Sequence, residues 1–116
     1  MINRAAVILK YKAPAIKWIN EADPIQDNPG ITADTVNSER TVYLITDNDA
    51  DGKDAIKNWI KQNYKVLFES ELEGWYTEPS LWPAKRTLKL FNEWFVVECH
   101  SMLIDTVGGA IYDDDI

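Results

Sequence analysis

The chain has little cysteine or histidine and no long hydrophobic run. Its 116 residues include one cysteine, Cys99, and one histidine, His100. A single cysteine cannot form an internal disulfide, which excludes the small secreted scaffolds that depend on such bridges. The apolar run at residues 5–9 is too short for a signal peptide, and a membrane helix needs roughly 18 apolar residues. We therefore expect a cytoplasmic protein with no membrane partner.

Basic residues are scarce relative to acidic ones. The chain has 12 lysines and arginines against 19 aspartates and glutamates, which gives a net charge of −7. Affinity for nucleic acids and for anionic lipids comes from basic side chains that displace counterions. The charge balance therefore predicts no nucleic acid partner and again no membrane partner.

The chain does have enough apolar residues for a core. Apolar residues make up 46% of the sequence, as in globular proteins. A chain of this length folds as one domain and buries roughly two-thirds of the surface that it exposes when unfolded. We predict a single domain over residues 1–116, with a frayed acidic tail from about residue 108.

Hydrophobic periodicity and turn residues predict the order of the elements. Residues 4–11 are apolar on both faces of an extended chain, which favours a central strand. Further strands are expected at 41–46 and 95–106, and helices at 15–22, 32–37, 53–73 and 86–94. This pattern predicts an α+β fold, with a small sheet of about three or four strands and helices packed mainly on one face.

The segment Asp47-Asn48-Asp49-Ala50-Asp51-Gly52 has the composition of a metal site. Carboxylates at alternate positions followed by glycine can wrap Ca²⁺ or Mg²⁺. An EF-hand also needs a glutamate at the twelfth position, where this chain has Asn58. The other interpretation is a solvated turn whose aspartates cap the following helix. We favour the cap and keep a cation site at Asp47, Asp49 and Asp51 as the alternative.

The same segment resembles the metal-binding turn of Toprim domains. A strand, an Asp-x-Asp-x-Asp-Gly turn and a helix follow one another in both. Toprim domains also have a glutamate directly after an earlier strand. In this chain the strand ending at Tyr11 is followed by Lys12-Ala13-Pro14. The resemblance therefore lacks a residue that magnesium chemistry requires.

Aromatic residues gather in a stretch without regular periodicity. Five tryptophans is a high number for so short a chain, and Trp75, Tyr76 and Trp82 fall between two predicted helices. Irregular backbone that carries large aromatic side chains often forms ligand or partner sites. The alternative is that these rings cover one end of the sheet and enlarge the core.

Glu98 and His100 lie two residues apart on the last predicted strand, so their side chains share a face. A carboxylate beside the imidazole raises its pKa and makes a general base or a pH-sensitive contact conceivable. The alternative is a hydrogen-bonded structural histidine. Cys99 points to the opposite face, so Cys99 and His100 cannot form a catalytic dyad. Arg86 is a conceivable ion-pair partner for Glu98.

The second half of the chain contains the pattern Glu71-Leu72-Glu73-Gly74-Trp75-Tyr76-Thr77, then Ser80-Leu81-Trp82-Pro83, Arg86-Thr87, Phe91, Trp94-Phe95, Glu98 and His100-Ser101-Met102. This pattern resembles a family of short, uncharacterised bacterial proteins. The resemblance implies a bacterial cytoplasmic protein with a focus around Trp75, Trp82, Arg86, Glu98 and His100. It implies no activity.

Together these patterns predict a small binding or regulatory module rather than an enzyme. Its surface would be formed by Trp75, Tyr76, Trp82, Arg86, Glu98 and His100, and its partner would be another protein or a second copy. No cofactor is expected. The alternative is a divalent-cation-dependent hydrolase or phosphotransfer enzyme that uses Asp47, Asp49 and Asp51.

Overall fold

A computed structural model describes residues 1–25 and 28–113. Within these residues, three antiparallel strands form one sheet in the order β2-β1-β3. The central strand is β1 (Arg4–Tyr11), and its neighbours are β2 (Val42–Thr46) and β3 (Phe95–His100). The prediction that the first strand is central is confirmed.

The two faces of the sheet differ in what covers them. The inner face carries Ala5, Val7, Leu9 and Tyr11 from β1, all of which are buried. The register places Tyr43 and Ile45 of β2, and Phe95, Val97 and Cys99 of β3, on the same face. On the outer face Val42, Leu44 and Val96 are exposed. The helices therefore pack on one face, as predicted.

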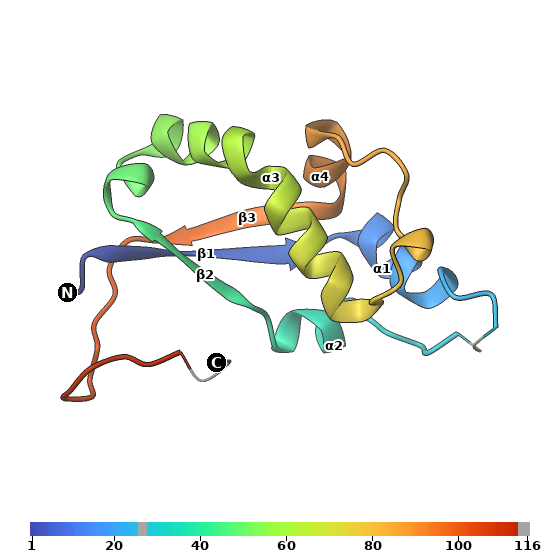
Figure 1. The fold of residues 1–116 in the computed structure, drawn as a ribbon, viewed down its shortest axis with the longest axis horizontal. Coiled ribbons are helices and arrows are strands. Elements are labelled where there is room, and N and C mark those ends of the chain that lie inside the picture. Colours follow the sequence, from blue (N-terminus) through green and yellow to red (C-terminus); the bar gives the residue numbers. More distant parts are fainter. Residues whose placement is uncertain (26–27, 114–116) are drawn as a thin grey trace.

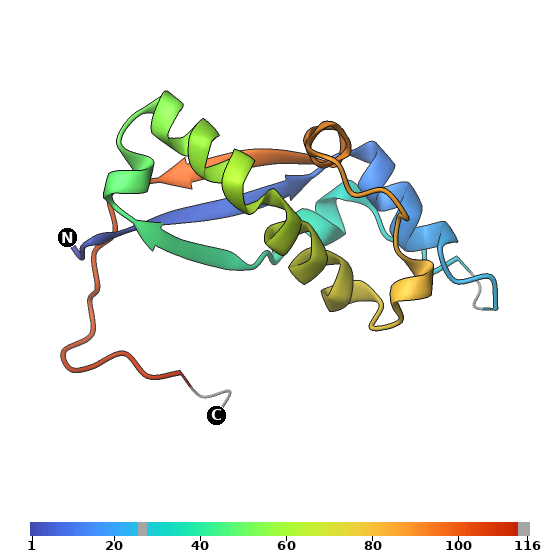
Figure 2. The ribbon, with the colours of Figure 1, turned by 45° about the horizontal axis from the view of Figure 1, so that its top comes forward.

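The helices are α1 (Ala13–Glu21), α2 (Ala33–Ser38), α3 (Lys53–Trp75) and α4 (Leu88–Trp94), with single 3₁₀ turns at Asn48–Ala50 and Pro79–Leu81. Figure 1 shows that α3 crosses the inner face of the sheet diagonally, whereas α1 and α2 lie at one end of it. Figure 2 shows the same layering from a second direction. The fold is a small α+β fold.

The core lies between α3 and the inner face. Phe68 of α3 and Phe91 of α4 are fully buried, and their rings stand 5.9 Å apart. Phe68 also packs edge-to-face on Phe95 of β3 at 5.6 Å. Aromatic contacts of this kind add stability beyond the burial of area alone. Trp94 is buried, and Trp18 and Trp59 are half-buried against this core.

Four predicted boundaries differ from the structure by two residues or more, and the first is the start of α1, which lies at Ala13 rather than at residue 15. The last strand ends at His100 rather than at residue 106, and its pairing with β1 runs only from Tyr11↔Phe95 to Ala6↔His100. The last helix begins at Leu88 rather than at residue 86, because the Thr87 hydroxyl accepts a hydrogen bond from Leu90 N and caps it. The long helix continues through Gly74 and ends at Trp75 rather than at residue 73.

The helix predicted at 32–37 is α2, and Thr32 caps it through a hydrogen bond from Thr35 N. Residues 101–113 form no helix or strand. The end of the predicted tail, residues 114–116, and part of the loop at 24–30, residues 26–27, lie outside the described residues. Within the described ranges, no helix has the length and apolar character needed to cross a bilayer.

Candidate functional site

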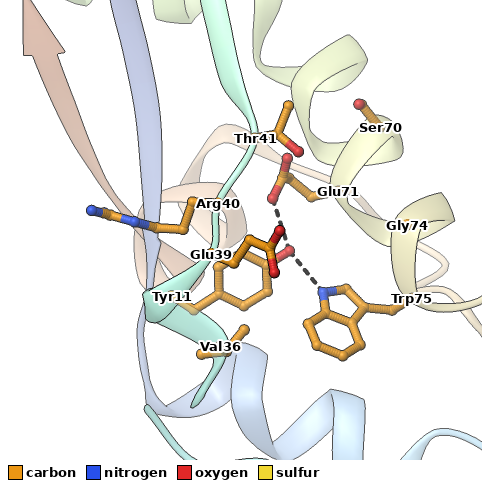
Figure 3. A pocket seen from close by; sticks show the side chains of 9 residues that line it. All are labelled: Tyr11, Val36, Glu39, Arg40, Thr41, Ser70, Glu71, Gly74 and Trp75. Carbon is orange, nitrogen blue, oxygen red and sulfur yellow. Dashed lines mark hydrogen bonds between the residues drawn. The ribbon is translucent and has the colours of Figure 1, made fainter. Parts of the chain in front are cut away.

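A polar pocket of about 180 Å³ lies where the end of β1, the connection between α2 and β2, and the last turns of α3 meet. Figure 3 shows its lining, which combines aromatic, hydroxyl and carboxylate side chains: Tyr11, Val36, Glu39, Arg40, Thr41, Ser70, Glu71, Gly74 and Trp75. We call it the acidic pocket. Of the residues that the sequence singled out as a binding surface, it contains only Trp75.

Glu71 is the centre of a hydrogen-bond network beside this pocket. The Tyr11 hydroxyl donates to Glu71 Oε1 over 2.9 Å, and the Tyr43 hydroxyl donates to Glu71 Oε2. Trp75 Nε1 in turn donates to the Tyr11 oxygen over 3.0 Å. Figure 3 shows the dashed links from Trp75 through Tyr11 to Glu71. The two phenols and the indole fix the carboxylate in one orientation.

The sequence assembles this network through two periodicities. Tyr11 and Tyr43 both occupy inward positions of their strands, because side chains alternate between faces. Glu71 and Trp75 are four residues apart on α3, so they share one face of the helix. The diagonal crossing of α3 brings that helix face over the two tyrosines.

The electrostatics of the network are unusual because the carboxylate is half-buried without a cation. Burial raises the pKa of the Tyr11 phenol, and the charge of Glu71 raises it further. Burial also raises the pKa of Tyr43, and its hydrogen bond to Glu71 raises that pKa further. In the described part of the chain, no lysine, arginine or histidine lies within ion-pair distance of Glu71.

The one cationic residue that lines the acidic pocket is directed elsewhere. Arg40 Nη1 lies 2.9 Å from Glu98 Oε1, across the outer face of the sheet. Figure 3 shows the Arg40 guanidinium pointing away from Glu39 and Glu71. The pocket therefore presents two carboxylates with no positive charge of its own directed between them.

Two of the predicted aromatic residues are used for structure. Trp82 Nε1 donates to the Tyr76 carbonyl over 2.8 Å, and the Tyr76 hydroxyl donates to the Ile19 carbonyl. Trp18 packs edge-to-face on Tyr76 at 5.3 Å and donates to the Leu81 carbonyl over 2.9 Å. We call Tyr76 and Trp82 with Trp18 the aromatic lid, because they cover α1 and the end of the core.

Arg86 belongs to this lid and does not pair with Glu98. Its guanidinium carbon lies 5.8 Å from the centre of the Trp82 ring, and Nη2 lies 3.2 Å from Glu69 Oε1. Arg86 Nη1 donates to the Pro83 carbonyl over 2.9 Å. The Arg86–Glu98 pair that the sequence suggested is therefore not formed, because the two residues lie on different sides of the molecule. Arg86 pairs with Glu69 of α3, and Glu98 pairs with Arg40.

Glu98 and His100 lie together on the outer face of the sheet, as the alternation predicts. Glu98 Oε2 is 3.8 Å from His100 Nε2, and the hydrogen bond from Arg40 holds the pKa of Glu98 below its usual value. The His100 side chain is largely exposed. Cys99 points to the inner face, where burial raises the pKa of its thiol. The predicted binding surface is thus divided among three places.

The triple-aspartate segment forms a 3₁₀ turn, and none of its aspartates caps α3. Gly52 holds the cap position with a positive φ of 92°, and no side chain accepts a bond there. Asp49 instead accepts a hydrogen bond from the Thr46 hydroxyl over 2.7 Å. The predicted cap is wrong because the turn places a glycine ahead of the helix. Among the described residues, no group of three His, Cys, Asp or Glu side chains is arranged to hold a metal ion.

Sequence reasoning missed Tyr11, Tyr43 and Glu71. One signal was available, since tyrosines at inward strand positions need a buried partner for each hydroxyl. The identity of that partner depends on the angle at which α3 crosses the sheet. Comparisons with known proteins give no further guide, since no family model, curated protein or solved structure matches this chain.

Proposed function

We propose that the chain is a binding module that receives a lysine or arginine side chain of a partner protein in the acidic pocket. The observation that carries the proposal is Glu71, a half-buried carboxylate that accepts from two phenols and has no cation within ion-pair distance among the described residues. Partly desolvated charges attract an opposite charge more strongly than exposed ones do.

The remaining lining of the pocket suits a cationic group. A carboxylate has about four lone-pair sites, so Glu71 can accept further hydrogen bonds beyond those from the two tyrosines. Glu39 adds a second carboxylate, and the Thr41 and Ser70 hydroxyls add acceptors. Trp75, which is 36% exposed, adds an aromatic ring with which a cation can make a cation–π contact. A partner's lysine or arginine would satisfy all of these groups at once.

A titration with small amines tests this proposal. Nα-acetyl-lysine amide and Nα-acetyl-arginine amide are added to the ¹⁵N-labelled protein, and the Trp75 indole N–H resonance is followed. We expect at least one of the two ligands to shift this resonance in a saturable way, and Glu71→Gln to weaken binding about tenfold, as for a lost charge-assisted contact.

Two controls separate this contact from nonspecific attraction to an acidic protein. Glu73→Gln removes the same charge from an exposed position two residues farther along α3, and it should leave the titration unchanged. Nα-acetyl-norleucine amide has no charge and should not shift the Trp75 resonance. Equal effects of the two glutamate substitutions, or no shift with either cationic ligand, would contradict the proposal.

Three further expectations concern the location, the source and the partners of the protein. We propose a cytoplasmic bacterial protein without a nucleic acid partner, on the basis of its single cysteine, its net charge of −7 and the family resemblance. No observation in the described residues favours the cation-dependent hydrolase or phosphotransferase that the triple-aspartate segment suggested.

A further inference from the structure

A second surface, separate from the acidic pocket, lies along the unpaired edge of β3. Here α3, α4 and β3 enclose an apolar groove of about 400 Å³. Its floor is formed by Ile56, Ile60, Leu88, Phe95 and Val97. A second hollow shares Ile56, Lys57 and Val97 with it and extends it to Cys99, so the two form one trough, which we call the β3 groove.

The rim of the β3 groove is basic. Lys53, Lys57 and Lys61 border it from successive turns of α3, and all three are exposed. Among the lining residues, Asp54 is the one acidic side chain. None of the three lysines is in an ion pair with another described residue. A local charge of +2 (three lysines against one aspartate) on a chain of net charge −7 selects an anionic occupant.

The edge of β3 adds a second binding feature. β1 pairs with one side of β3, and no described strand pairs with the other side. An edge strand presents backbone N–H and C=O groups on every second residue, to which an extended segment can add as a further strand. The occupant should therefore be extended, apolar and acidic.

The tail of this chain, residues 101–113, has these properties. Five of its apolar side chains are more than 70% exposed: Met102, Ile104, Val107, Ile111 and Tyr112. From residue 101 onward the sequence contains four aspartates and no lysine or arginine. Exposed apolar side chains in such number usually mark a surface that a partner covers.

We propose that residues 104–113 of one copy add to the β3 edge of a second copy, with apolar side chains in the β3 groove and aspartates near Lys53, Lys57 and Lys61. The exchange is reciprocal, so the product is a symmetric dimer. Ten extended residues span roughly 33 Å, which is enough to reach a neighbouring molecule.

The path of the tail favours binding to the β3 groove of a second copy over binding to the groove of its own chain. One backbone hydrogen bond still holds Leu103 beside the start of the chain, because its carbonyl accepts from Ile2 N over 2.9 Å. Beyond this point Figures 1 and 2 show the tail running away on the β2 side of the sheet, opposite to the β3 edge. The groove of the same chain is thus left open.

Sedimentation equilibrium of the full chain over a range of concentrations tests the proposal. We expect the mass to rise from 13.3 kDa toward twice that value. A groove variant, Lys57→Glu with Lys61→Glu, and a tail variant, Val107→Ser with Ile111→Ser, should each weaken the dimer at least about tenfold. Lys17→Glu, an exposed charge reversal on α1, is the matched control and should leave the dimer unchanged.

A mixing experiment distinguishes exchange between copies from folding back within one. The groove variant retains an intact tail, and the tail variant retains an intact groove. Mixed together, with one of them isotopically labelled, they should form a 1:1 heterodimer detectable by native mass spectrometry. A wild-type chain that stays at 13.3 kDa at all concentrations, a dimer that survives both variants, or variants that remain monomeric when mixed would each overturn the proposal.

Discussion

The acidic pocket and the aromatic lid lie at the same end of α3 and contain similar residues, yet they differ in what their polar atoms contact. In the lid, Trp82 and Tyr76 donate to backbone carbonyls, and Arg86 has an acidic partner in Glu69. In the pocket, the phenols of Tyr11 and Tyr43 converge on a carboxylate that lacks a cation. An aromatic-rich segment alone therefore does not identify a site. A charge without a counter-charge is the more informative feature.

The largest effect should come from breaking the lid. Trp82→Ala removes a half-buried ring and its hydrogen bond to the Tyr76 carbonyl, so we expect a loss of about 3–4 kcal/mol in the free energy of unfolding. Trp75→Ala, at the more exposed ring of the pocket, should lose only about 1 kcal/mol. Urea denaturation of both variants measures the difference. Equal losses would remove the distinction between the two regions.

The second largest effect should come from alkaline pH, which should lower the free energy of unfolding through the phenols of the acidic pocket. The pKa values of Tyr11 and Tyr43 are raised in the folded protein, so it keeps protons that the unfolded chain releases near pH 10. Stability from these phenols is therefore present below pH 10 and lost above it. Two such groups should account for a loss of about 3 kcal/mol between pH 9 and pH 11.

The control for this measurement is a double variant that carries both Tyr11→Phe and Tyr43→Phe. Burial also raises the pKa of Tyr76, but Tyr76 is present in both proteins, so the difference between their pH profiles isolates the two pocket phenols. Urea denaturation at each pH gives the profiles. If the double variant loses as much stability as the wild type over this range, the phenols do not titrate as we expect.

The smallest effect should come from the outer face of the sheet. Glu98→Gln breaks the 2.9 Å pair with Arg40, and both side chains are partly solvated. Such pairs contribute little, so we expect a loss of about 0.5 kcal/mol. The same denaturation series measures it, with Glu73→Gln as an unpaired control on α3. A loss above about 2 kcal/mol would mean that the charge of Glu98 on the outer face, rather than the charge in the acidic pocket, matters more for stability.

Much of the fold was accessible from the sequence because local rules determine it. The apolar faces of residues 4–11 predicted the central position of β1, and the helix predicted at 32–37 is α2. The end of β3 was not accessible in this way, because it depends on how far its pairing with β1 continues. Pairing between distant segments has no signal in the sequence of either one.

The candidate site was less accessible than the fold. Of the six predicted surface residues, Trp75 alone lines the acidic pocket, while the others lie in the lid or on the outer face. Tyr11 and Glu71 are 60 residues apart, and nothing near either of them in the sequence points to the other.

By itself, the sequence determined the fold class, the alternation of side chains on each strand and the shared helix face of Glu71 and Trp75, since each follows from a fixed backbone period. Only the tertiary structure decided that this helix face lies over Tyr11 and Tyr43, and that Arg40 turns to Glu98 and leaves the pocket acidic. The crossing of α3 over the sheet results from how all core side chains pack together, so no local pattern encodes it.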